Sequence, residues 1–473
     1  MSLTRQVAHN TIIQMVGKIA STLIGVIALG MLARYLGVEK MGWYTTSVGF
    51  LQFIGILTDF GLIPVTAQML GEENGLDKKK LLNNLFGFRL TSSLIFFAFA
   101  PFIALLFPYP PEIHQAIWLS AIGFVGIGLN QIFTGYFQYK LKMHIQAFGE
   151  LLSRIILIAC MLIVVLSQTS FLQTIALLVV PNIAFTLFLF LGARTQTPIR
   201  PSFDFKIWKI ICIKMWPIAI SILFNVIYLK GDLVILSYYR SQTEIGLYGS
   251  AYRVVDILSQ TAMLFMGLIL PLLAASWSNK KFDEMQNRSQ KAFEGLMMLT
   301  LPAVAGVMVL APRIMTLING KEFILAGAPL RVLAFAILGV FIGSFFGHMA
   351  VAINAQKKTI WIYLSSAVLT LLGYFICIPR FGMMGAAWMS VFSEMYVGLM
   401  LMLVIYPLSK VKLDFLPLFK SIFAAGVMVG VLLSLHTLPT VLLILIGGTV
   451  YGTILFVTGG ISKEIVKVII SKK

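Results

Sequence analysis

The stretch Ile245–Ala274 reads IGLYGSAYRVVDILSQTAMLFMGLILPLLA. It is apolar and long enough to cross a bilayer as a helix, yet it contains Arg253 and Asp256. In a helix, both residues share one face with small or polar neighbours at spacings of three and four, namely Gly246, Ser250 and Gln260. A charge in hydrocarbon costs roughly 2.5–3.5 kcal/mol on insertion scales. The sequence therefore predicts that this face looks onto protein or water.

Two interpretations of this stripe are open. In the first, Arg253 and Asp256 form a buried ion pair, three residues apart, that locks two helices together. In the second, the stripe lines a polar cavity within the membrane. Several other segments carry stripes of the same kind, which favours the second interpretation.

The composition is typical of a polytopic membrane protein. The chain is 59% hydrophobic and 11% charged, with a mean hydropathy of +0.93, whereas about a quarter of a soluble domain is charged. Long apolar segments predict helices rather than the alternating strands of an outer-membrane barrel. Cys160, Cys212 and Cys377 are widely spaced and indicate neither a disulfide framework nor a metal site.

The apolar segments predict about fourteen transmembrane helices in an all-α polytopic membrane protein. The first is not a signal peptide, because its apolar region is too long and Lys18 interrupts it. The predicted spans are 11–33, 42–69, 82–107, 115–137, 146–167, 171–193, 214–238, 245–273, 293–318, 327–353, 360–378, 384–407, 418–436 and 440–459.

Lys and Arg gather in every second connection between these spans, as in Lys78–Lys80 and Lys280–Lys281. This positive-inside pattern predicts a multi-pass protein of the cytoplasmic (inner) membrane with both termini cytoplasmic. The formal net charge of +18 is then a matter of topology and contact with anionic membrane lipids, and no nucleic-acid partner is predicted.

A faint internal repeat relates Met41–Tyr44, at the start of the second span, to Ile245–Tyr248, at the start of the eighth. It predicts two six-helix halves of parallel topology. Between them, residues 203–213 alternate apolar and basic side chains and predict a short helix in the membrane interface. The predicted parts are an N-terminal lobe (1–194), a cytoplasmic interfacial linker helix (195–213), a C-terminal lobe (214–408), and two extra transmembrane helices with a basic cytoplasmic tail (409–473).

The first two helices of each predicted half carry a polar face. A single such stripe usually makes contacts between helices, but four in repeat-related positions predict a shared hydrophilic cavity. Besides the stripe of the eighth span, they contain Gln14, Lys18, Ser21 and Gly25 in the first span; Thr46, Gly49, Gln52 and Asp59 in the second; and Pro217, Ser221, Asn225, Tyr228 and Asp232, with Lys230 nearby, in the seventh.

Further charges lie within the spans. Arg89 is a candidate substrate-binding residue, whereas Glu150 and Arg154, four residues apart, predict a helix-stabilising pair. Glu394 has no neighbouring cation in the sequence and is a candidate proton or sodium site. The acidic candidates for coupling or charge pairing are Asp59, Asp232, Asp256 and Glu394.

The motifs of several enzyme classes are missing. There is no Walker A motif, no large outer loop with paired carboxylates for glycosyl chemistry, and no metal-ligand spacing among the five histidines. The chain is therefore not predicted to be an enzyme or to hold a cofactor or metal.

Three short motifs carry a family resemblance: Asp59-Phe60-Gly61-Leu62, the run from Gly246 to Arg253, and Gly385-Ala386-Ala387-Trp388. In these the chain resembles the polysaccharide-exporter (lipid-linked oligosaccharide flippase) family, whose superfamily includes MATE multidrug transporters and lipid II flippases. The resemblance implies two six-helix lobes around a cationic central cavity, worked by alternating access, plus two C-terminal helices here. It also implies site roles for Lys18 and Arg253.

These observations predict a flippase for a polyprenyl-pyrophosphate-linked oligosaccharide, with membrane lipids and glycan-assembly proteins as further partners. A diphosphate cannot cross hydrocarbon unaided, and Arg and Lys would bind it through charge-assisted hydrogen bonds. The alternatives are a cation-coupled multidrug exporter of the same fold and a lipid II flippase; either exporter or flippase would use proton or sodium coupling. The predicted substrate-binding residues are Lys18, Arg89, Gln52, Asn225, Lys230 and Arg253.

Overall fold

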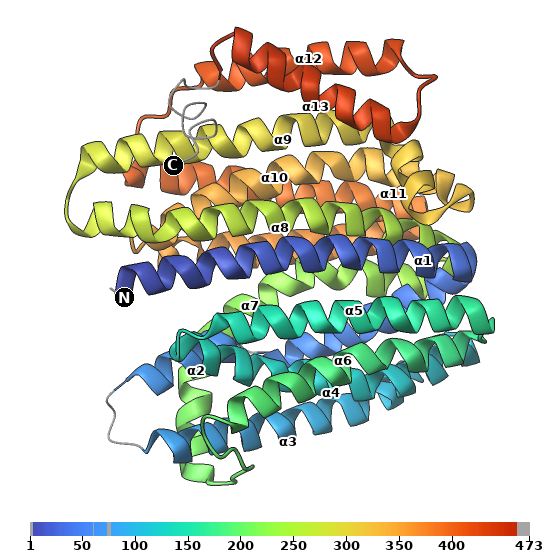
Figure 1. Ribbon diagram of the computed structural model, residues 1–473, viewed down its shortest axis with the longest axis vertical. Coiled ribbons are helices and arrows are strands. Elements are labelled where there is room, and N and C mark those ends of the chain that lie inside the picture. The colour runs from blue at the N-terminus through green and yellow to red at the C-terminus, as the bar shows by residue number, and fades with distance from the viewer. Residues whose placement is uncertain (1–2, 60, 73–76, 461–473) are drawn as a thin grey trace. The chain divides into compact units, whose positions relative to one another are not determined.

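The computed structural model describes residues 3–59, 61–72 and 77–460, apart from the side chains of residues 3–16, 19, 56–59, 64 and 217–229. These parts of the chain are helical and contain no strand (Figure 1). The α-helices are α1 (Leu3–Asp59), α2 (Leu62–Gly71), α3 (Lys78–Ala104), α4 (Pro111–Tyr139), α5 (Met143–Ser167), α6 (Phe171–Arg194), α7 (Phe205–Tyr239), α8 (Gln242–Ser278), α9 (Phe282–Asn319), α10 (Gly327–Ala352), α11 (Ile360–Ser409), α12 (Leu416–Ser434) and α13 (Thr440–Val457).

Two of these elements, α1 and α11, are each a pair of helices joined at a glycine. Gly37 has φ 70° and ψ 178°, and Gly382 has φ 57° and ψ −135°. Side chains disfavour both conformations, so each glycine lets one helix end and the next begin without a loop. Both lie within the eleven helical segments that are long and apolar enough to cross a membrane in the part of the chain described. The predicted multi-pass, all-α fold is confirmed, with two of these eleven segments each containing a pair of helices.

The chain forms two compact units, the first ending at Gly246 and the second beginning at Leu247. The first unit therefore contains α1 to α7 and the first turn of α8, and the second contains the remainder of α8 and α9 to α13. The four-part division into 1–194, 195–213, 214–408 and 409–473 stays a prediction.

The first unit is held together by apolar packing among α2 to α7. In one cluster, Phe86 of α3 contacts Phe133 of α4 and Phe190 of α6, with ring centroids 5.8 and 6.1 Å apart. A second cluster joins α1, α3 and α4 around Phe50 and Phe97. Burial of such large side chains contributes about 1.5–3 kcal/mol each in a water-soluble protein, and in lipid their close packing has to supply the specificity.

The segment between α6 and α7 is fastened to α3 by two consecutive asparagines. The backbone N–H of Arg200 donates to Asn83 Oδ1 (3.1 Å), and that of Asp204 donates to Asn84 Oδ1 (2.8 Å). Lys80 adds an ion pair with Asp204 at 2.9 Å. This ammonium lowers the pKa of the Asp204 carboxyl, helped by the backbone N–H of Lys206, which donates to the same carboxylate as a helix cap.

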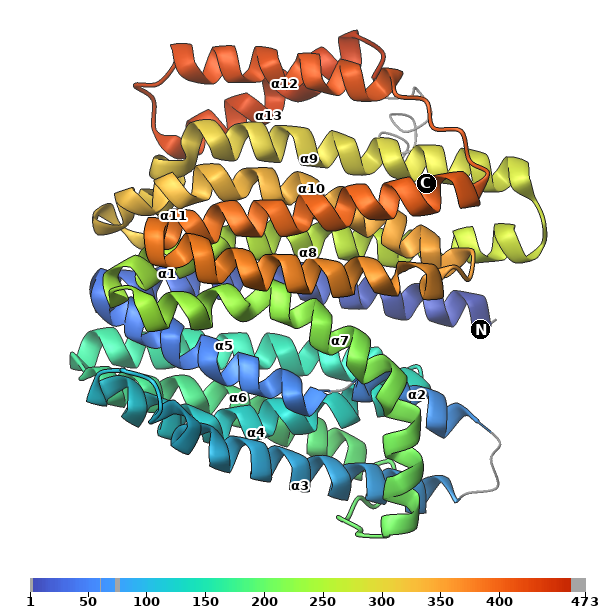
Figure 2. The same cartoon turned by 180° about the vertical axis from the view of Figure 1, so that it is seen from behind.

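Residues 205–213 differ from the predicted interfacial helix, because they are the first turns of α7. Ile207 and Ile211 are buried in the apolar cluster with α2, α3 and α4, whereas Phe203 and Ile210 are exposed. Figure 2 shows α7 changing direction along its length, with its first turns running across the end of α3. Lys214 of this part forms an ion pair with Glu72 just after α2, and that contact lowers the Glu72 pKa.

In the second unit, α12 and α13 pack along α9, around the buried side chains of Leu310, Met428 and Leu443 (Figure 1). They are joined to the rest of the unit by residues 411–415, which belong to no helix. These residues are named the extended segment below.

Two glutamines of α9 bind this extended segment as a neighbouring strand would. Gln286 accepts from the backbone N–H of Lys412 (2.7 Å) and donates to its carbonyl. Gln290 likewise accepts from Asp414 N–H (2.8 Å) and donates to its carbonyl (3.0 Å). The match is geometric, because four helical residues rise about 6 Å and two extended residues about 6.6 Å.

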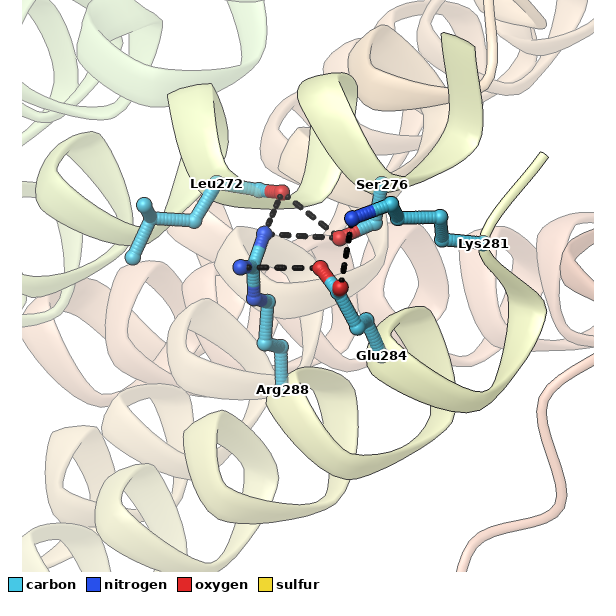
Figure 3. A network of polar contacts seen from close by, with 5 residues as sticks. All are labelled: Leu272, Ser276, Lys281, Glu284 and Arg288. Atoms are coloured by element: carbon cyan, nitrogen blue, oxygen red, sulfur yellow. Dashed lines mark hydrogen bonds and ion pairs between the residues drawn. The ribbon is translucent and has the colours of Figure 1, made fainter. Parts of the chain in front are cut away.

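The turn between α8 and α9 is held by a polar network (Figure 3). Arg288 of α9 donates to the Leu272 carbonyl (2.8 Å) and to Ser276 Oγ (2.7 Å) of α8, and pairs with Glu284 at 3.0 Å. Lys281 also pairs with Glu284, at 2.9 Å. Arg288 thus holds α8 and α9 together beside this turn.

Candidate functional site

A stripe of small residues on α1 lets α5 approach closely. Gly17, Ser21 and Gly25 follow one another at intervals of four and so lie on one face of the helix. A Cβ on Gly17 would lie 3.0 Å from the Cβ of Ala147 on α5, tighter than ordinary contact. Such stripes are typical of helix pairs in membranes, where close packing replaces the hydrophobic effect.

The predicted site residue Lys18 lies at this contact and is paired there. Its Nζ is 2.9 Å from Oε1 of Glu150 on α5. The Ser21 hydroxyl is 3.0 Å from the same oxygen and 3.0 Å from the Lys18 carbonyl, so its single proton can be donated to one of them at a time. The Lys18 side chain is 36% exposed and that of Glu150 19%, so the pair is only partly shielded.

Arg154 lies one turn beyond Glu150 on α5, and the predicted pairing of these two residues is not what the structure shows. Glu150 binds Lys18 and Ser21 on α1 instead. The guanidinium of Arg154 lies against α1, with Cζ, Nε and Nη1 each 3.8 Å from the position that a Cβ of Gly25 would take. Its Nε is buried and has no hydrogen-bond partner, although the side chain as a whole is half-buried. The sequence did not indicate Arg154 as a binding residue, because the spacing of four predicted that Glu150 neutralises it.

The polar stripe of α8 becomes more exposed along the helix. Ser250 is buried, Arg253 and Asp256 are half-buried, and Gln260 is exposed. The Ser250 hydroxyl is buried without a hydrogen-bond partner. The stripe therefore begins in a packed contact with other helices and ends at an accessible surface.

The first turn of α8 crosses the second part of α1 at two glycines. A Cβ on Gly42 would lie 1.8 Å from the carbonyl oxygen of Gln242, and one on Gly246 would lie 2.1 Å from that of Val38. Thr46, on the predicted stripe of the second span, donates to Gln242 Oε1 at 2.7 Å beside this crossing. The two motifs that suggested an internal repeat therefore contact one another through their glycines.

Within the second unit, the same end of α8 is bound to α11. The Tyr248 hydroxyl is 3.0 Å from Ser390 Oγ, which is 3.4 Å from the hydroxyl of Tyr374. All three side chains are buried. This hydrogen-bonded group fixes the rotation of α8 about its axis, and hence the direction in which Arg253 projects.

The remaining predicted substrate-binding residues differ in setting. Arg89 is 1% exposed and donates from Nε to the Gly128 carbonyl of α4 (2.9 Å), so it joins two helices. Gln52 is exposed on α1, and Lys230 on α7 is half-buried. The side chain of Asn225 lies outside the described residues.

Among the predicted acidic residues, Asp232 is 1% exposed and accepts from the backbone N–H of Leu233. Asp256 and Glu394 are half-buried, and the side chain of Asp59 lies outside the described residues. At Glu394, α11 lies so close to α10 that a Cβ on Gly339 would be 2.5 Å from its backbone carbonyl carbon. Among the described residues, no three His, Cys, Asp or Glu side chains gather as a metal site requires.

A cavity of about 430 Å³ lies at the other end of the first part of α1 from Lys18. It is bounded by the α5–α6 turn, where Tyr35 donates to the Thr169 carbonyl at 2.6 Å. Its lining residues are Tyr35, Leu36, Lys40, Val165, Gln168, Thr169 and Phe171. The predicted topology places this polar cavity at the outer face.

The α1–α5 contact and the α8 stripe thus share a chemical character. The α1–α5 contact has Lys18 and Arg154 and the α8 stripe has Arg253, none of them wholly buried, on helices with segments long and apolar enough to cross a membrane. Lys18, Glu150 and Arg154 together carry one net positive charge. Such sites can bind anions through charge-assisted hydrogen bonds, a planar guanidinium holding two oxygens at once and an ammonium acting as a point charge.

Residues 31–328 of the chain match the model of a family described as polysaccharide biosynthesis protein. A relative in Haloferax volcanii, the probable low-salt glycan biosynthesis flippase Agl15, is 25% identical over 230 residues. That match spans about half of each chain, 48% of both.

Solved structures of similar fold cover almost the whole chain. The lipid II flippase MurJ in an inward closed conformation matches 95% of this chain and 99% of its own, with a TM-score of 0.79 and 16% identity. An inward-facing multidrug resistance MATE transporter of the MOP superfamily matches 84% of this chain and 98% of its own (TM-score 0.68, 16% identity). At these identities the likeness shows a shared fold.

Proposed function

The chain belongs to the family of polysaccharide biosynthesis proteins, and from this premise we propose that it is a flippase for a polyprenyl-diphosphate-linked oligosaccharide in the cytoplasmic membrane. The observation that carries the proposal is that Lys18 lies on α1 and Arg253 on α8, helices with segments long and apolar enough to cross a membrane, and that neither side chain is wholly buried. Charged residues within such helices are rare and commonly functional, and basic side chains are suited to binding anions. The Haloferax volcanii relative, named as a glycan biosynthesis flippase, supports a glycan as the cargo.

In this proposal the chain's basic residues bind the diphosphate while the lipid tail stays in the bilayer. Lys18, in the first unit, and Arg253, in the second, are each able to replace water around phosphate oxygens, which could not enter hydrocarbon unaided. Gln52, Asn225 and Lys230 are retained as predicted contacts for the headgroup. Arg89 is also retained as a predicted contact, although its Nε donates to the Gly128 carbonyl and so joins α3 to α4. Two states of the carrier, open to either side, would exchange by rocking of the two halves.

Coupling to protons or sodium is part of the same proposal. Its candidates are Asp59, Asp232, Asp256 and Glu394, of which Asp256 and Glu394 are half-buried and therefore reachable by an ion. Acidic residues at membrane depth commonly mark ion pathways. No cofactor is proposed.

The test is export of glycan in cells that depend on this chain. We expect Arg253→Ala to abolish export, Arg253→Lys to leave part of it, and Lys18→Ala to be severe, with protein levels in the membrane unchanged. The rival interpretation of Arg253 as the mere counter-charge of Asp256 predicts that Arg253→Ala combined with Asp256→Ala restores export, because no buried charge is left unpaired. A restored double variant would remove Arg253 from the site.

A second candidate is translocation of lipid II, favoured by the fold match to MurJ over 95% of the chain. Both substrates share the polyprenyl diphosphate, so the basic residues would act in the same way. Rescue of cells depleted of their own lipid II flippase, without rescue of glycan export, would favour this second candidate over the first.

A further inference from the structure

The first unit has more basic than acidic groups where α1 meets α5. Glu150 and Glu112 are the acidic residues in the sequence of α3 to α6, and Glu112 is in the first turn of α4, which the predicted topology places at the outer face. Glu150 is therefore the acidic residue of α3 to α6 that lies near two cations, Lys18 on α1 and Arg154 one turn away on α5. The structure gives its carboxylate to Lys18 and to Ser21, at 2.9 and 3.0 Å.

Arg154 is the cation that remains. Its buried Nε has no hydrogen-bond partner, and Gly25 leaves the guanidinium without a side chain packed over it at that point of α1. The side chain is half-buried, so the guanidinium is enclosed on the α1 side and accessible from another. A guanidinium stays protonated at any physiological pH, so it cannot remove the mismatch by losing its charge.

We infer that Arg154 binds the phosphate groups of an anionic lipid-linked substrate, next to Lys18, and that Glu150 is the resident counter-ion that such a substrate displaces. This assignment rests on the proposed function, and names a binding residue outside the predicted set. The guanidinium offers paired N–H groups to two phosphate oxygens, and the Lys18 ammonium can turn from Glu150 to a third. Glu150 then keeps the Ser21 hydroxyl as its donor.

The Lys18–Glu150 ion pair sets the net charge of the site when no substrate is bound. With no substrate, Lys18 and Glu150 neutralise each other and the excess is one positive charge. A bound diphosphate adds negative charge beside Glu150, so the carboxylate opposes binding and limits affinity, as release on the other side of the membrane requires. Loss of the Glu150 charge should therefore tighten binding, whereas loss of the Arg154 charge should weaken it.

The test measures direct binding of farnesyl diphosphate, which has the diphosphate and no glycan, to purified protein in phosphatidylcholine nanodiscs. We expect the wild-type protein to bind it, Arg154→Gln to bind on the order of ten- to a hundredfold more weakly, and Arg154→Lys to lie between them. Glu150→Gln should bind several-fold more tightly. The matched control is Arg331→Gln, an exposed arginine of α10, which should bind as the wild type does.

Glu150→Gln keeps the proposal falsifiable if Arg154→Gln does not fold, because a misfolded protein does not gain affinity. A merely structural role of the cluster predicts no gain for Glu150→Gln. Wild-type-like affinity in both variants would overturn the assignment of Arg154 and leave the proposed function standing. Failure of the wild type to bind farnesyl diphosphate at all would overturn both.

A last arm separates a substrate site from a site for ordinary phospholipid headgroups. Phosphatidylglycerol included in the nanodiscs should compete only weakly with farnesyl diphosphate, because one phosphodiester charge is a poorer match for the two cations than a diphosphate. Competition at equal concentration, lost in Arg154→Gln, would show a lipid-headgroup site and overturn the substrate assignment.

Discussion

Adding one methyl group to either glycine of the α1–α8 crossing should destabilise the first unit. A Cβ on Gly42 would stand 1.8 Å from the Gln242 carbonyl oxygen, and ordinary contact begins near 3.4 Å, so the helices must separate by about 1.6 Å. Overpacking of this kind costs about 1–3 kcal/mol. The separation also weakens the Thr46–Gln242 hydrogen bond, worth about 1 kcal/mol, while alanine returns about 0.5–1 kcal/mol of helix propensity. The net expected loss is about 1–3 kcal/mol.

The assay is the melting temperature of detergent-purified protein, followed by size-exclusion chromatography after heating. Gly267→Ala is the matched control, because the same helix offers open space there and nothing lies within 4 Å of the added Cβ. We expect Gly246→Ala to melt below this control and Gly42→Ala to do the same. The double variant should lose less than the sum of the single losses, since one separation relieves both contacts. Melting equal to that of Gly267→Ala, or fully additive losses, would refute the geometric reasoning.

Three further outcomes are expected. The double variant Gln286→Leu, Gln290→Leu should leave four backbone groups of the extended segment without their partners, which should lower stability by about 1–3 kcal/mol and make the segment more sensitive to protease. Unchanged cleavage in this segment would contradict the role assigned to the two glutamines. The Lys80 contact lowers the Asp204 pKa, so the contribution of this ion pair to stability is complete above the ordinary value of 3.8 and disappears as pH falls through the lowered value. Asp204→Asn should therefore reduce the loss of stability at acidic pH, and an unaltered loss would contradict this role of the ion pair. Cysteine introduced at Thr437 should react with a membrane-impermeant reagent in intact cells, and cysteine at Lys281 only after permeabilisation. Labelling of cysteine at Lys281 in intact cells would contradict the predicted topology.

Periodicity and length were enough to predict the helices. Each predicted span has a helix in the structure, because about 20 apolar residues have few ways to satisfy their backbone in lipid other than as a helix. The two places where helices join without a loop are marked by Gly37 and Gly382, and a glycine between two apolar runs is a signal that sequence alone offers.

The linker before α7 shows where periodicity stops being informative. Ile207 and Ile211 lie at helical spacing beside lysines, a pattern equally typical of a helix on a membrane surface and of one packed against protein. Asn83 and Asn84, more than a hundred residues away in the chain, bind the linker to α3. These contacts place the isoleucines in a protein core rather than on a membrane surface.

The choice of charge partners was beyond sequence reasoning for a similar reason. A spacing of four on one helix favours Glu150 with Arg154 by only a few tenths of a kcal/mol. A close contact with a second helix, created by Gly17 and Ser21, outweighs that preference and brings Lys18 within 2.9 Å. Because Glu150 pairs with Lys18, Arg154 has a buried Nε without a hydrogen-bond partner, which the sequence did not indicate.

The glutamine clamp on residues 411–415 has a consequence for how this chain can change in length. Gln286 and Gln290 reach every second residue of the extended segment, and the residue between, Leu413, points its backbone elsewhere, toward the Tyr406 hydroxyl. Inserting or deleting one residue would present the wrong backbone groups to both glutamines, whereas a change of two would restore the register. Homologous chains that keep both glutamines should therefore vary in this connection by even numbers of residues, and a parity rule of this kind can be read in an alignment without any further structure.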